Sequence, residues 1–137
     1  MKFLIYFLIL FPVLPAIADD WLTYYEKSNY TRTPRYKETI KYCQRLANAS
    51  SMIHYTTFGK SPQGRDLPFL IVDKNGNFTP ETVRETDNVV FFVQAGIHSG
   101  EIDGKDAGLM LIRDIVIKKK FQSLLDREYQ LEHKKIL

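Results

Sequence analysis

The amino-acid sequence predicts an α/β fold, the N-terminal part of a mixed sheet that helices cover on both faces in three layers (α/β/α). Two observations predict it. Patterns typical of a helix, a β-hairpin, a strand and a second helix follow one another between residues 34 and 117. Among them, Val89 to Ala95 (VVFFVQA) form an almost continuous apolar run. Such a run is typical of a strand buried on both faces of a sheet.

Residues 34–49 are predicted to form the first helix. Thr33 is a favourable capping residue, and Pro34 suits the first helical turn. Apolar residues then recur at helical spacing, as an amphipathic helix requires. They include the only cysteine, Cys43, which we expect to be a buried structural thiol.

The hairpin is predicted from two runs rich in β-branched and aromatic residues. Met52 to Phe58 and Leu67 to Val72 are such runs, and residues 59–64 (GKSPQG) between them have the composition of a turn. Residues 77–87 are expected to be a polar loop. Asp103 to Ile117 then show the spacing of a second helix.

The first 18 residues predict a secretory signal peptide. Lys2 precedes a short apolar run, and the run ends in the small-residue pattern Ala16-Ile17-Ala18. The apolar run is shorter than the roughly 20 residues that span a bilayer. We therefore expect cleavage after Ala18, export to the periplasm or the medium, and no stable membrane insertion afterwards.

Composition excludes several classes of protein. The chain has 137 residues, of which 45% are hydrophobic and 26% charged, which is ordinary for a globular domain. A net charge of +3 gives no case for a nucleic-acid partner. One cysteine allows no internal disulfide.

The candidate metal ligands lie in residues 96–101 (GIHSGE), directly after the apolar run. His98 lies just past the C-terminal end of the expected strand, and Glu101 is expected in the first turn of the second helix. Ligands of open α/β sheets bind beyond the carboxyl ends of the strands. One imidazole and one carboxylate supply two of the three protein ligands of a catalytic zinc ion. By itself, H-x-x-E is a weak pattern.

Two segments resemble the zinc carboxypeptidases of the carboxypeptidase A type. GIHSGE is similar to the segment that carries the family's first two zinc ligands, which fall on His98 and Glu101. Residues 59–68 (GKSPQGRDLP) are similar to the family's hairpin turn, G-x-S-x-x-G-R-x-[IL]. The resemblance covers about residues 34–117. Gly100 stands where animal digestive members usually have Arg, which leaves specificity open.

The resemblance implies a zinc-dependent hydrolase that removes C-terminal residues from peptides. It implies one Zn²⁺ in a His-Glu-His site, a catalytic Glu, and arginines and an asparagine that hold the terminal carboxylate of a peptide. No residue of this chain is assigned to the third ligand, the general base or the carboxylate clamp; His54 and His133 are poor substitutes. We therefore expect a truncated, inactive domain at residues 34–126, preceded by an arm at 19–33 and followed by an atypical polar tail at 127–137.

Two other functions stay open at this point. Zinc deacylases of the aspartoacylase type share a Gly-x-His-x-x-Glu segment, so an amidase acting on small amides or cell-wall peptides is an alternative. The hairpin motif favours the peptidase. The remaining alternative is an exported remnant without catalysis.

Overall fold

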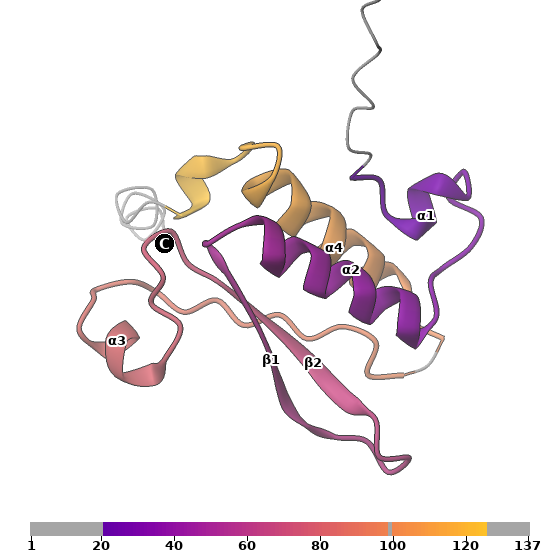
Figure 1. Cartoon of the computed structure of the whole chain (residues 1–137), viewed down its shortest axis with the longest axis horizontal. Coiled ribbons are helices and arrows are strands. Elements are labelled where there is room, and N and C mark those ends of the chain that lie inside the picture. Colours follow the sequence, from indigo (N-terminus) through magenta and orange to yellow (C-terminus); the bar gives the residue numbers. More distant parts are fainter. Residues whose placement is uncertain (1–20, 99, 126–137) are drawn as a thin grey trace, which may run out of the picture.

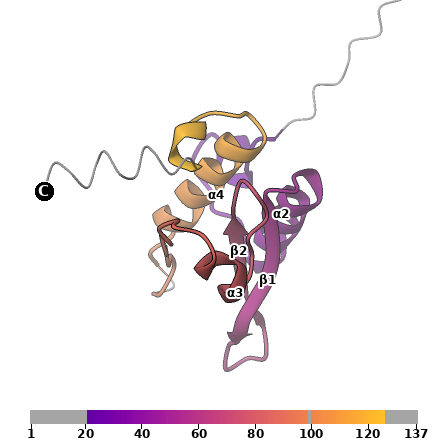
Figure 2. The same cartoon turned by 90° about the vertical axis from the view of Figure 1, so that its left-hand side faces the viewer.

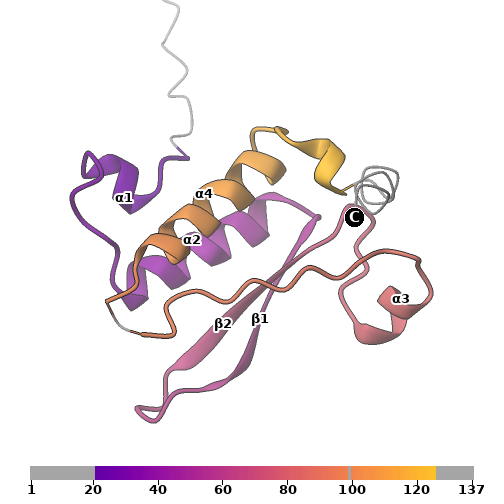
Figure 3. The same ribbon diagram turned by 180° about the vertical axis from the view of Figure 1, so that it is seen from behind.

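The computed structural model describes residues 21–98 and 100–125, and its core is a pair of helices beside a β-hairpin (Figure 1). Helix α2 packs against both strands, and α4 lies alongside α2 (Figures 1 and 3). The predicted α/β class is confirmed. The elements are α1 (Tyr24–Lys27), α2 (Tyr36–Ala49), β1 (Ile53–Lys60), β2 (Asp66–Val72), α3 (Pro80–Arg84), α4 (Asp103–Val116) and a final 3₁₀ helix (Gln122–Leu125).

The hairpin is antiparallel and begins and ends close to the predicted residues. Ile53 lies opposite Val72, and Lys60 lies opposite Asp66, with a bulge just before Gly59. The Lys60 Nζ lies 2.6 Å from Asp66 Oδ1 and joins the two strands at the turn. Figure 2 shows the hairpin as a long ribbon that extends beyond the helices.

The hydrophobic core lies where α2, α4 and β1 meet. Its members are fully or almost fully buried: Cys43, Leu46, Ile53, Leu109, Ile115 and Val116. Burial raises the pKa of the Cys43 thiol to about 11. The thiol therefore stays protonated and unreactive at neutral pH, which confirms the prediction of a structural cysteine.

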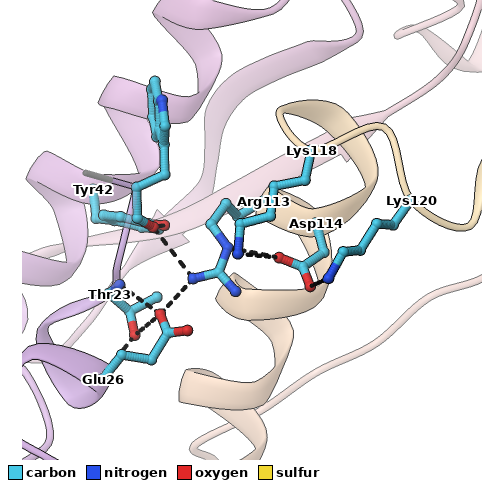
Figure 4. Close-up of polar contacts among 8 residues, drawn as sticks. Thr23, Glu26, Tyr42, Arg113, Asp114, Lys118 and Lys120 are labelled. Atoms are coloured by element: carbon cyan, nitrogen blue, oxygen red, sulfur yellow. Dashed lines mark hydrogen bonds and ion pairs between the residues drawn. The ribbon is translucent and has the colours of Figure 1, made fainter. Parts of the chain in front are cut away.

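The N-terminal arm is folded onto α2 and α4. A reciprocal pair of hydrogen bonds between Thr23 and Glu26 caps α1. The buried Arg113 of α4 donates to the Glu26 carboxylate and to the carbonyl of Trp21 (Figure 4). Tyr42 of α2 donates to that same carbonyl at 2.7 Å. These contacts hold the described part of the arm against α2 and α4.

The predicted strand at Val89–Ala95 is wrong for the described residues. The segment is irregular, and its side chains reach exposures of 72% at Val90 and 85% at Phe91. A strand requires a hydrogen-bonded neighbour, but the only sheet among the described residues consists of β1 and β2. Among the described residues the apolar run therefore has no partner strand, and most of its side chains are exposed.

Two smaller differences concern the helix boundaries. Helix α2 begins at Tyr36 rather than at residue 34, and Arg35 provides no side-chain cap. The Thr33 hydroxyl, predicted to cap α2, instead accepts a hydrogen bond from Lys105. The predicted loop at 77–87 contains α3, which Thr79 caps and Pro80 starts.

Some expectations fall on residues outside the described ranges. The signal peptide at 1–18 and the polar tail at 127–137 are among them. Within 21–98 and 100–125, no helix is long and apolar enough to cross a membrane.

Candidate metal centre

The candidate site is the turn that joins the irregular segment to α4. Gly96 has a φ of +70°, a left-handed conformation that glycine adopts without strain, and it redirects the chain just before His98. The amide of Glu101 then donates to the carbonyl of His98 at 3.0 Å. This bond closes a turn, so the side chains at 98 and 101 are brought together. Glu101 lies just before α4 rather than within its first helical turn.

The two side chains meet at their polar ends. Nδ1 of His98 lies 2.9 Å from Oε1 of Glu101, within hydrogen-bond distance. The imidazole side chain is 78% exposed and the carboxylate side chain is 63% exposed. Because both groups are open to solvent on one side of the turn, a third partner can reach them together.

The chemistry of this donor pair fits zinc. Zinc binds imidazole nitrogen and carboxylate oxygen, both at about 2.0–2.2 Å. Two donors sharing a tetrahedral ion would lie about 3.4 Å apart. The pair is therefore slightly too close, and a small rotation of two exposed side chains would open it.

The pair is incomplete as a closed metal site. No group of three His, Cys, Asp or Glu side chains that could hold a metal is found among the described residues. His54, the other histidine in those ranges, stacks on Phe78 with ring centroids 5.5 Å apart. His133 lies outside the described ranges.

A charged pair lies just behind the turn, in the first part of α4. Lys105 Nζ donates to Thr33 Oγ1 and to Asp106 Oδ1, each at 2.7 Å. The Asp106 side chain is just 3% exposed, so this ion pair is largely buried on its acidic side. Sequence reasoning missed the cluster, because no local pattern links Lys105 to a threonine 72 residues earlier.

Comparison with known proteins shows that a family model matches the part of the chain that contains this turn. Residues 39–128, about two thirds of the chain, match the family model described as zinc carboxypeptidase. The matched range includes the hairpin, both candidate ligands and all of α4. Neither the curated proteins nor the solved structures yielded a match.

Proposed function

This chain belongs to the zinc carboxypeptidase family, and on that premise we propose that His98 and Glu101 are two of the protein ligands of a catalytic zinc ion. The observation that carries the proposal is the 2.9 Å approach of Nδ1 to Oε1 in a solvent-exposed turn. At family level the function is that of a zinc carboxypeptidase-like hydrolase.

The proposed reaction is removal of C-terminal residues from peptides. His98 and Glu101 would hold a zinc ion that, when bound, would supply a coordinated water with a pKa of roughly 7 and would polarise the scissile carbonyl. His98 and Glu101 hold the ion through one neutral and one anionic donor. Among the described residues no third ligand joins this pair, so we expect the chain by itself to be inactive.

Zinc titration of matched variants tests the ligand pair. We expect His98→Ala to abolish zinc binding, measured by competition with a chromophoric chelator. His54→Ala is the matched control, because it removes the same side chain from an exposed position on β1. Binding that His54→Ala weakens as much as His98→Ala would remove the site from residues 98–101.

An activity assay tests the proposed division of the catalytic residues. The purified protein should not hydrolyse a blocked dipeptide, with or without added zinc. Zinc-dependent hydrolysis that His98→Ala abolishes would mean that the chain already holds every residue the reaction needs.

Export is the remaining part of the proposal. It is supported by the apolar start and the Ala16-Ile17-Ala18 pattern. N-terminal sequencing of protein recovered outside the cytoplasm should begin at Asp19. Recovery of the intact Met1 form in the cytoplasm alone would contradict export.

A further inference from the structure

The Lys105–Asp106 pair is built in a way that packing does not explain. Asp106 is only 2% exposed, and its Oδ1 accepts from the Lys105 ammonium. Its second oxygen, Oδ2, is buried and has no hydrogen-bond partner among the described residues. A buried carboxylate with an unpartnered oxygen costs stability. A role for its charge, rather than for its packing, would account for its presence.

The charge lies a few residues along the chain from the candidate metal ligands. Lys105 follows Glu101 by four residues, with the acidic residue on the N-terminal side. The lysine stem is long and flexible, so the ammonium can move between neighbouring carboxylates. In the structure, however, it contacts Thr33 and Asp106, while Glu101 contacts His98.

We propose that Asp106 and Thr33 hold the Lys105 ammonium away from Glu101, so that the Glu101 carboxylate stays available to share a cation with His98. Asp106 is thus a positioning residue that acts through Lys105. The identity of the cation as zinc rests on the function proposed above, but the placement of the ammonium does not.

Two variants of the first turn of α4 test this role. Asp106→Asn releases the ammonium, and we expect zinc to bind about threefold to fivefold more weakly, the size of one exposed ion pair in competition. Asp103→Asn is the matched control. It changes the net charge equally in the same turn of α4, but Asp103 is exposed, and the Lys105 ammonium bonds Thr33 and Asp106. Its zinc affinity should stay within twofold of wild type.

A double variant separates this role from a structural one. Lys105→Met combined with Asp106→Asn removes the released ammonium and should return zinc affinity to that of wild type. A double variant as weak as Asp106→Asn, or Asp106→Asn as tight as Asp103→Asn, would overturn the proposal. If circular dichroism shows that Asp106→Asn does not fold, Thr33→Val replaces it, since it removes the other partner of the ammonium.

A metal-free measurement keeps this inference separate from the zinc proposal. The ¹⁵N chemical shift of the His98 imidazole reports its contact with Glu101. It should change in Asp106→Asn, stay unchanged in Asp103→Asn and return in the double variant. If wild type binds no zinc, the proposed function fails, and these shifts still decide where the ammonium lies. Identical shifts in all variants would overturn the positioning role.

Discussion

The surroundings of Arg113 and the segment at residues 89–98 contrast with each other. Arg113 is a charged residue with 2% exposure, whereas Phe91 is an apolar residue with 85% exposure. Charged residues are usually exposed and large apolar residues are usually buried, so both residues depart from the usual distribution. The guanidinium is buried because Glu26, Asp114 and the carbonyl of Trp21 all accept from it (Figure 4).

Whether a side chain is buried depends on the partners that the fold brings to it. Nε of Arg113 donates to Asp114 of α4 and Nη1 donates to acceptors of the arm, so the desolvation of the guanidinium is offset. The apolar segment has Phe69 as a neighbour, with its ring 6.1 Å from that of Phe92. An apolar cleft of about 480 Å³ nevertheless remains between this segment, β2 and the helices. Hydrophobicity alone did not close it.

The largest effect on stability is expected from removal of the buried Arg113 guanidinium. Arg113→Ala would leave the Glu26 carboxylate, whose side chain is 8% exposed, without its cation. We expect a loss of about 3–5 kcal/mol in the free energy of unfolding, as for other broken buried pairs. Urea denaturation followed by circular dichroism measures it. Arg84→Ala, at an exposed end of α3, is the control and should change little.

Leu46 tests the apolar core in the same way. Its side chain is fully buried, so Leu46→Ala should cost about 2–5 kcal/mol through lost burial and a residual cavity. Leu111→Ala, at a residue that is 47% exposed, is the matched control. Equal urea midpoints for the two variants would show that the core is not packed as described.

The pH dependence of the free energy of unfolding tests the role of the Glu26 charge. Burial acts to raise the pKa of its carboxyl, but hydrogen bonds from Arg113 and Thr23 outweigh burial and hold the pKa below its ordinary value of 4.5. As the pH falls, the Glu26 carboxyl is therefore protonated at a higher pH in the unfolded chain than in the folded chain. The stabilisation is complete above about pH 4.5 and is lost as pH drops through the lowered folded pKa.

Comparison with Glu26→Gln isolates this contribution. The variant should be less stable than wild type at pH 7, and the gap should narrow below pH 4.5. Asp114, whose carboxyl pKa is also lowered by Arg113 and Lys118 despite burial, contributes acid sensitivity to both proteins. A gap of constant size from pH 7 to pH 3 would contradict the role of the Glu26 charge.

The smallest effect on stability is expected in the exposed apolar segment at residues 89–98. Phe91→Ser should change the free energy of unfolding by less than about 0.5 kcal/mol, because little apolar surface is removed from water at this residue. Urea denaturation measures it beside Leu46→Ala. A loss as large as that of Leu46→Ala would show that the aromatic ring is buried in solution.

Elements held by local or nearest-neighbour interactions were predictable from the sequence. The helical spacing around Cys43, the turn composition at residues 59–64 and the spacing after Asp103 each predicted an element within a few residues of its observed bounds. The closeness of His98 and Glu101 also follows from a local turn. Whether these two side chains bind zinc stays a prediction.

Elements that depend on distant partners were not predictable. The hydroxyl of Thr33 accepts a hydrogen bond from Lys105, and Glu26 of the arm accepts one from Arg113, across 72 and 87 residues. The apolar run at Val89–Ala95 has the composition of a central strand, but a strand also needs a neighbour.

The sequence by itself determined the α/β class, the hairpin, the two long helices and the motif that places an imidazole next to a carboxylate. Only the tertiary structure decided which charges are buried, where the Lys105 ammonium lies and which apolar residues stay in contact with water. The physical reason is that spacing and turn chemistry act over a few residues. Desolvation is offset only by groups that the folded chain brings together from far apart.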